Sequence, residues 1–134
     1  MSGCRFINQN VTMKRATSRQ LIIPVTDENG QPFDLTNGNA AWWLGTSPAA
    51  RTPPDVILKK DTQSIGGMQI VPPTPPGTLW SLSVFIQAAD TRNAMPRSSY
   101  YHEASVVDRG FNVYVVAFGT FEILQSMTPD QFIT

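Results

Sequence analysis

Residues 79–87 read LWSLSVFIQ and alternate between two kinds of side chain. Successive side chains of a β-strand point to opposite faces of a sheet. One face of this stretch is entirely apolar: Trp80, Leu82, Val84 and Ile86. The pattern predicts a half-buried strand whose apolar face packs on a core.

Other stretches rich in β-branched and aromatic residues predict further strands, at residues 19–26, 39–45, 56–60, 68–71, 99–107 and 111–124. Eleven prolines and nine glycines lie between and within them, leaving few windows for a helix. We expect helical structure only as a short turn at 88–94. Pro24 predicts an edge position or a bulge for its strand, because proline cannot donate to a strand ladder. The sequence therefore predicts an all-β protein, an antiparallel β-sandwich.

Two stretches carry large apolar side chains on both faces. Trp42 and Trp43 must point to opposite faces, and we expect Trp42 in the core and Trp43 available to a partner. In the last strand, strict alternation places Tyr114 and Phe118 on one face and Phe121 on the other. A strand that is apolar on both faces is either central or covers an interface, so Tyr114 and Phe118 are candidate partner-binding residues.

A length of 134 residues fits one domain. We predict an extended N-terminal arm at 1–17, in which residues 4–11 could form a strand, a sandwich at 18–124 and a C-terminal tail at 125–134. The basic residues of the first segment form the only charge cluster: Arg5, Lys14, Arg15 and Arg19. Such an arm could lie on an acidic neighbouring subunit, or its charges could simply be solvated.

Composition favours a protein that works against partners. Charged residues make up 15% of the chain, against roughly 25% in ordinary soluble domains, and ten basic residues balance ten acidic ones. This neutrality disfavours binding to nucleic acid or membranes, while a sparse charge suits an interface. The alternative is a neutral monomer. The single Cys4 and the polar N-terminus indicate synthesis in a reducing cytosol, without a signal peptide.

Residues capable of chemistry are few. One histidine and one cysteine cannot build a usual zinc site, and we expect His102 to be a hydrogen-bonded histidine near the core rim. Glu103 and Asp108 could be imagined as a glycosidase pair, but Asp108 begins a predicted turn. A loose calcium loop is suggested by Asp27, Asn29 and Asp34, but these residues lack the bidentate glutamate and the spacing of an EF-hand. We therefore expect no enzymatic activity, no metal and no cofactor.

Three stretches in order carry a family resemblance: VTDENGQPFDLT at 25–36, then Asp90-Thr91 with YYHEASVVD at 100–108 and Gly110, and GTFEI at 119–123. Together they resemble the immunoglobulin-like β-sandwich proteins of tailed bacteriophages, and are similar to the N-terminal domain of baseplate upper proteins. The resemblance spans residues 18–124 and implies an immunoglobulin-like sandwich in a non-enzymatic virion component. It departs at Trp42-Trp43 and at the prolines of 72–76, and the chain lacks a long C-terminal extension.

These features predict a virion structural protein made in the host cytoplasm. We favour a capsid decoration or cement subunit that forms a homo-oligomer and binds other virion proteins, such as the major capsid protein or tail proteins. A tail or baseplate adaptor is the alternative. A hypothesis of another class is a carbohydrate-binding module that uses an exposed tryptophan.

Overall fold

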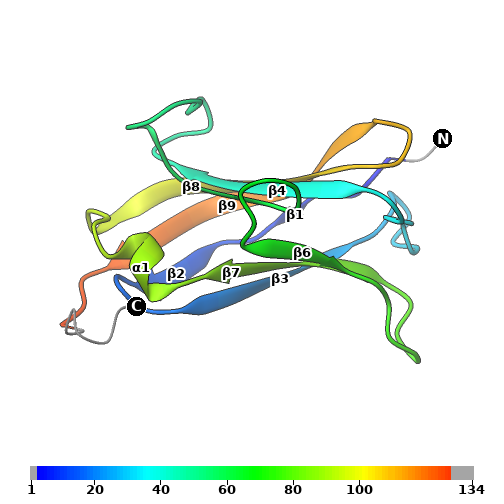
Figure 1. Cartoon of the computed structure of the whole chain (residues 1–134), viewed down its shortest axis with the longest axis horizontal. Helices are drawn as coiled ribbons and strands as arrows, with labels where there is room; N and C mark the ends of the chain where they lie inside the picture. The colour runs from blue at the N-terminus through cyan, green and yellow to red at the C-terminus, as the bar shows by residue number, and fades with distance from the viewer. Residues whose placement is uncertain (1–2, 128–134) are drawn as a thin grey trace.

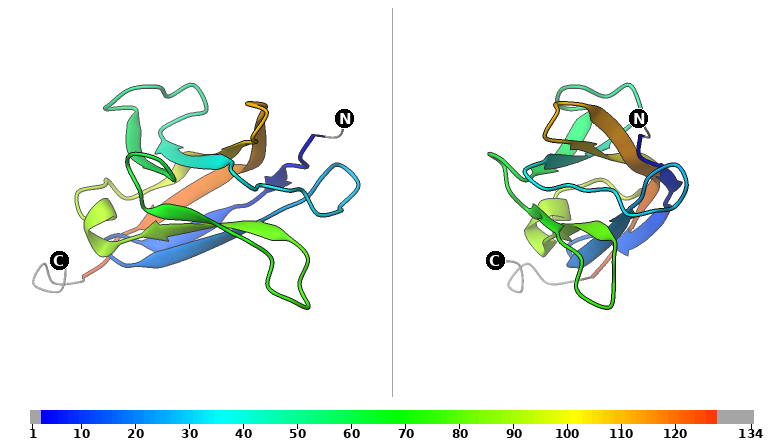
Figure 2. Two further views of the ribbon diagram at one scale, coloured as in Figure 1. Left: turned by 45° about the vertical axis from the view of Figure 1, so that its right-hand side comes forward. Right: turned by 90° about the vertical axis from the view of Figure 1, so that its right-hand side faces the viewer.

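Two stacked β-sheets make up the molecule (Figures 1 and 2). The computed structural model describes residues 3–127, without the side chains of Arg97 and Ser98. Its strands are β1 Ile7–Asn8, β2 Val11–Lys14, β3 Arg19–Val25, β4 Asn39–Gly45, β5 Val56–Asp61, β6 Met68–Val71, β7 Trp80–Ile86, β8 Arg97–Val107 and β9 Val113–Leu124. The prediction of an all-β sandwich is confirmed.

The larger sheet has the strand order β1-β9-β8-β4-β5, and β2 also pairs with β9. The smaller sheet has the order β3-β7-β6. All pairings are antiparallel except those of β1 and β2, which run parallel to β9. β3 is an edge strand, which is one of the two positions that Pro24 predicted. The right-hand view of Figure 2 shows the two sheets facing each other across the interior.

The core lies between the sheets and follows the predicted alternation of β7, where Leu82, Val84 and Ile86 are buried. Trp80 is half-buried and packs against the edge of the core. Trp42 is fully buried and contacts the ring of Phe121 from β9, at 5.9 Å between centroids. The predicted assignment of Trp42 to the core is confirmed.

A β-bulge in β9 corrects the predicted faces of that strand. Ala104 of β8 pairs with Ala117, whereas the next residue, Ser105, pairs with Val115, so Val116 is the extra residue. One extra residue exchanges the two faces beyond it. Tyr114 therefore turns inward and packs edge-on against Phe33, while Phe118 lies on the outer face. Tyr114 and Phe118 do not share a surface, contrary to the prediction.

The first seventeen residues are extended but do not form an arm outside the sandwich. β1 and β2 lie along the edge of β9, and Val11, Met13 and Ala16 are buried. The predicted boundary at residue 18 is therefore wrong, because the larger sheet already begins at Ile7. Of the predicted tail, residues 125–127 follow β9 and 128–134 lie outside the described residues.

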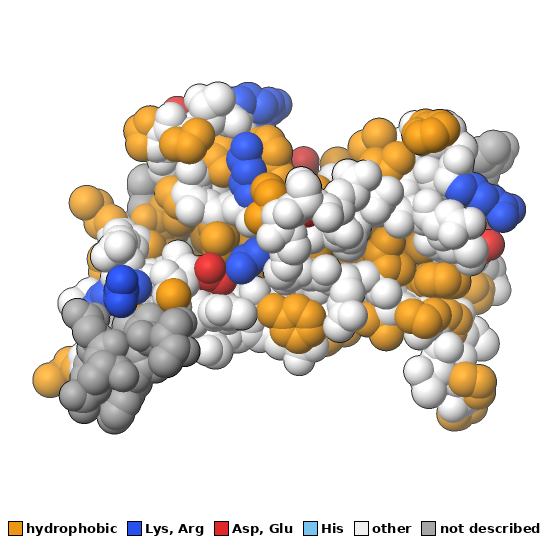
Figure 3. All heavy atoms as spheres, viewed as in Figure 1, with side chains coloured by type: hydrophobic (Ala, Val, Ile, Leu, Met, Phe, Trp, Pro, Cys, Tyr) orange, Lys and Arg blue, Asp and Glu red, His pale blue; other side chains and the backbone are white. Residues whose placement is uncertain are grey.

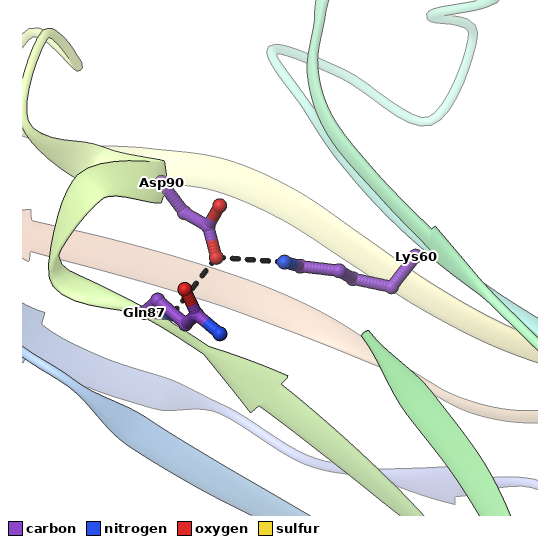
Figure 4. A network of polar contacts seen from close by, with 3 residues as sticks. All are labelled: Lys60, Gln87 and Asp90. Atoms are coloured by element: carbon purple, nitrogen blue, oxygen red, sulfur yellow. Dashed lines mark hydrogen bonds and ion pairs between the residues drawn. The ribbon is translucent and has the colours of Figure 1, made fainter. Parts of the chain in front are cut away.

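A single helical turn, α1 at Ala88–Thr91, lies within the predicted 88–94 segment and closes one end of the sandwich. Asp90 caps it by accepting a hydrogen bond from the backbone N–H of Gln87 at 2.8 Å. The same carboxylate oxygen lies 2.7 Å from Nζ of Lys60 on β5 (Figure 4). This ion pair links the larger sheet to the β7–β8 connection.

Candidate functional site

An open hollow of about 330 Å³ lies on the outer face of the larger sheet. Its floor is formed by β4 and β8, where Trp43 lies directly opposite Glu103 in the ladder. Tyr101 and Ser105 flank Glu103 on the same face. The loop 46–55 contributes the wall through Ser47, Pro48, Ala50 and Arg51.

Two contacts fix the polar and aromatic groups of this hollow. Tyr101 donates a hydrogen bond from its hydroxyl to Oε1 of Glu103 at 3.0 Å. Burial, and then the nearby Glu103 carboxylate, raise the pKa of Tyr101 to about 12, so this hydroxyl stays a donor at neutral pH. On the other side, Nζ of Lys59 lies 4.1 Å from the ring centroid of Trp43. The predicted exposed tryptophan is thus half-buried between a cation and the hollow.

A row of aromatic rings continues from the hollow across β9. Tyr101 lies 6.5 Å from Phe118, and Phe118 lies 5.5 Å from Phe6 at the N-terminal edge. Phe6 is 61% exposed. Phe118 is therefore a member of an outer-face cluster. Its neighbours there are Tyr101 and Phe6, not Tyr114 as the strict alternation predicted.

The hairpin between β8 and β9 ends in an exposed aromatic residue held in an unfavourable backbone conformation. Phe111 has φ of +63° and is 87% exposed. Asp108 organises the turn: its carboxylate accepts from the backbone N–H groups of Gly110 and Asn112, both at 2.9 Å. Val113, at the start of β9, is 65% exposed and extends this apolar tip.

The basic residues selected from the sequence do not form one cluster. Arg5 donates to the backbone oxygen of Glu28, in the turn beside the N-terminus. Near the other end of the sheet edge, Arg15 donates to the carbonyls of Arg92 and Ser126, and Arg19 donates to that of Thr12 at 3.0 Å. Lys14 is exposed on β2. The three arginines thus fasten the first strands and their neighbours to the rest of the chain.

His102 lies inside the sandwich rather than at its rim. Its Nδ1 accepts a hydrogen bond from Nε1 of Trp42 at 3.0 Å, so its Nε2 carries the proton and donates to the backbone oxygen of Gln9. Burial lowers the pKa of His102 below its usual 6.5, and the bond to Gln9 opposes this shift. Both ring nitrogens are engaged in structural contacts.

The remaining candidate carboxylates serve turns. Asp27 accepts from the backbone N–H groups of Asn29 and Gln31, and Asp34 accepts from the N–H and hydroxyl of Thr36. The hydrogen bonds to Thr36 lower the pKa of Asp34. Glu103 and Asp108 line different hollows, so they do not face one another across a cleft. Within residues 3–127, no group of three or more His, Cys, Asp or Glu side chains is placed to hold a metal ion.

Several residues of these sites were not predicted from the sequence, among them Tyr101, Arg51 and Phe111. Tyr101 shares the parity of Glu103, a signal that was present in the strand pattern. Arg51 lies in a loop, and only the fold of that loop brings it over the sheet. Phe111 follows Asp-Arg-Gly, where the glycine rather than the phenylalanine would be expected to take the left-handed conformation.

No family model matches the chain, and a search of curated proteins finds no significant match. Among the described residues, no helix has the length and apolar character needed to cross a membrane.

Proposed function

We propose that this protein is a non-enzymatic structural component of a bacteriophage particle, and that it binds neighbouring virion proteins through the tip of its β8–β9 hairpin. A capsid decoration subunit is the form we favour, and a tail or baseplate adaptor is the alternative. Two kinds of observation support the proposal: the sequence resemblance, and the exposed apolar residues at the tip of the β8–β9 hairpin.

The observation that carries the proposal is the conformation of Phe111. A positive φ is unfavourable for a bulky side chain, by roughly 1–2 kcal/mol, and glycine or asparagine would avoid that cost. Phe111 gains almost no burial in return, since 87% of it is exposed. Strained, exposed residues cluster at functional sites, and aromatic anchors dominate protein interfaces. Phe111 therefore has the properties of an anchor that inserts into an apolar pocket of a partner.

The surroundings of the tip suit the same role. Val113 adds an exposed apolar side chain beside it, and Phe6 adds another at the N-terminal edge of the larger sheet. Figure 3 shows charged side chains thinly spread on the visible face, between neutral polar and apolar groups. A surface with little charge loses little solvation on docking.

Two further observations support the proposal. The groups that could act in catalysis are engaged structurally, His102 through both nitrogens and Asp108 through its turn. The sheet orders β9-β8-β4-β5 and β3-β7-β6 also match the G-F-C-C′ and B-E-D groupings of immunoglobulin-like sandwiches. The immunoglobulin-like assignment itself remains part of the proposal.

The test compares Phe111→Asn with Met95→Asn, a control at another exposed apolar residue. Particles of the phage that encodes each variant are purified, and the copy number of the protein is measured by mass spectrometry. We expect many copies of the wild-type and control proteins and loss of Phe111→Asn from particles, although free Phe111→Asn unfolds at a slightly higher temperature. A copy number proportional to the major capsid protein indicates decoration, and one proportional to tail proteins indicates an adaptor. Absence of the wild-type protein from particles contradicts the proposal.

A further inference from the structure

We propose that the hollow between Trp43, Glu103 and Arg51 binds a neutral pyranose sugar. This site lies at the loop 46–55, at the opposite end of the larger sheet from the β8–β9 hairpin (Figure 1). It would give the protein a binding activity separate from its attachment through Phe111.

The hollow has the size and the walls of a formed site. Its volume of about 330 Å³ falls in the range of small-molecule pockets, roughly 300–1000 Å³. Two backbone bonds hold the loop that forms its wall: Thr46 donates to the carbonyl of Asp55 at 2.8 Å and so joins the two ends, and Ala50 donates to that of Ser47 at 3.1 Å within the loop. Gly45 permits this close approach, because a Cβ there would lie 2.8 Å from Cβ of Ala50.

Trp43 supplies an aromatic plate. Lys59 lies over its ring but does not line the hollow, so the cation holds the indole from outside. The ring is thereby fixed beside Glu103, its direct neighbour across the ladder. The C–H face of a pyranose can pack on such a ring, as apolar groups pack on aromatic side chains in general.

Glu103 supplies a hydrogen-bond acceptor. Its Oε1 is held by the Tyr101 hydroxyl at 3.0 Å, which fixes the carboxylate without using its full accepting capacity. A carboxylate oriented beside an aromatic plate can accept hydrogen bonds from two hydroxyls of one sugar ring.

Arg51 supplies donors from the loop that forms the wall. Its Nη1 donates to the carbonyls of Pro48 and Ala50, at 3.1 and 2.9 Å, which anchors the guanidinium against its own loop. A guanidinium has five N–H donors, so Nη2 and Nε retain theirs for a ligand. The hydroxyls of Ser47 and Ser105 can both donate and accept.

The balance of charge selects a neutral ligand. A cationic ligand would meet Arg51 and, behind Trp43, Lys59, whereas an anionic ligand would meet Glu103. Hydroxyl groups both donate and accept, and can therefore use the Glu103 acceptor on the floor and the Arg51 donors on the wall equally well. A pyranose combines such hydroxyls with an apolar ring face.

The test is a titration of the full ¹⁵N-labelled chain with glucose, galactose, mannose and N-acetylglucosamine over millimolar concentrations. The readout is the indole N–H signal of Trp43, distinguished from those of Trp42 and Trp80 by Trp43→Phe and Trp80→Phe. Glycerol, which has hydroxyls without a ring face, and arginine amide, which is cationic, serve as ligand controls. We expect at least one pyranose to shift the Trp43 signal saturably, with no saturable shift from either control.

Two variants assign the binding to this hollow. Glu103→Gln can still accept from Tyr101 but lacks the charge, and we expect it to weaken sugar binding roughly tenfold or more. Glu122→Gln, at a carboxylate on β9 that does not line the hollow, should leave sugar affinity unchanged. Phe111→Asn should also bind sugar normally, so failure here is distinguishable from failure of the attachment proposal.

Three outcomes overturn the proposal. The first is the absence of a saturable shift with every pyranose. The second is an equal shift with glycerol, or a sugar affinity that Glu103→Gln leaves unchanged. The third is a saturable response to arginine amide without one to any sugar, which would make this a cation site.

Discussion

Nε1 of Trp42 donates a hydrogen bond to Nδ1 of His102 at 3.0 Å, within the closed interior between the two sheets. Because that bond requires an unprotonated Nδ1, it fixes one neutral tautomer of the ring. The opposite nitrogen then donates to the backbone oxygen of Gln9, between β1 and β2. His102 thus connects the interior strand β4 to the N-terminal edge of the sheet, and protonation of Nδ1 would break its bond to Trp42.

The first prediction is that the free energy of unfolding decreases as the pH falls through the range where an unfolded histidine becomes protonated. Burial lowers the pKa of His102 below 6.5 in the folded protein, so the unfolded chain binds more protons between the two values. The stabilisation is complete above pH 6.5 and is lost as the pH falls toward the folded value. Urea unfolding between pH 7.5 and pH 5 should reveal this decline.

His102 is the only histidine, which makes the test direct. Its imidazole signals can be followed by NMR in the folded protein and should titrate below pH 6.5. His102→Gln should remove the decline in stability over the same interval, whatever its own stability. A free energy of unfolding that stays level for the wild type from pH 7.5 to pH 5 would show that the ring is not held neutral.

The second prediction concerns Gly119, which lies opposite His102 in the β8–β9 ladder. A Cβ at this position would clash with the backbone oxygen of Gln9, the acceptor of the His102 bond. Gly119→Ala should force β1 and β2 away from β9 and lower the free energy of unfolding by roughly 1–3 kcal/mol, the usual range for overpacking. Hydrogen exchange should quicken at residues 7–14 before it quickens elsewhere.

Gly110→Ala is the matched control for this substitution. Its Cβ would meet no atom closer than 3.2 Å, and its φ is not in the left-handed region. It should change stability by less than about 0.5 kcal/mol, as exposed substitutions commonly do. Equal effects of the two substitutions would mean that loss of glycine, rather than the clash with Gln9, accounts for the change.

The third prediction is that deletion of residues 1–17 unfolds the protein instead of releasing an arm. The deletion removes Val11, Met13 and Ala16 from the core and leaves the edge of β9 unpaired. An exposed edge of this length also invites aggregation. Circular dichroism and light scattering of the truncated chain should show lost structure or aggregates. A folded, monomeric product would show that β1 and β2 are dispensable.

The sequence allowed a strand at residues 4–11 but did not predict that β1 and β2 pair with β9, and this has a physical reason. These strands pair with β9 across most of the chain, for example Thr12 with Glu122, and nothing in the local pattern reports such a partner. The alternation of residues 79–87 was sufficient for β7, because that strand pairs regularly on both sides. Where strand pairing is regular, the local sequence pattern shows to which face of the sheet each side chain points.

The bulge in β9 cannot be located from a local sequence pattern. Val115, Val116 and Ala117 are all small and apolar, so the sequence does not show which of them is the extra residue. The candidate sugar site was visible in part, since Trp43 was expected to point away from the core. Its other half required the fold of the loop 46–55, which no periodicity describes.

The fourth prediction separates charge from packing at Lys60 and Asp90. Their side chains are only 11% and 21% exposed, which places the pair between surface and buried ion pairs in strength. Asp90→Asn keeps an oxygen that can cap Gln87 but leaves the ammonium without a carboxylate, and should cost about 1–3 kcal/mol. Lys60→Met retains the apolar stem and leaves Asp90 its bond to Gln87. It should therefore cost less than Asp90→Asn in urea unfolding.

Asp55→Asn provides the control for removing one exposed negative charge, and should be nearly neutral. The comparison that matters is between the losses in free energy of unfolding caused by Lys60→Met and Asp90→Asn. If Lys60→Met costs more than Asp90→Asn, the unpaired carboxylate of Asp90 is costlier than the unpaired ammonium of Lys60, contrary to the prediction.

The last prediction is that the thiol of Cys4 reacts slowly in the folded protein. Burial raises its pKa from 9.0 to about 11, with smaller contributions from the nearby carboxylates of Asp108 and Asp27. Only the thiolate is nucleophilic, so a rise of two units lowers its population at neutral pH about a hundredfold. Alkylation by iodoacetamide at pH 8, followed by mass spectrometry, should be slower by about this factor than in the urea-unfolded chain. Because burial is the largest cause, added salt should change the folded rate little, whereas a rate that rises strongly with salt would assign the shift to the two carboxylates instead.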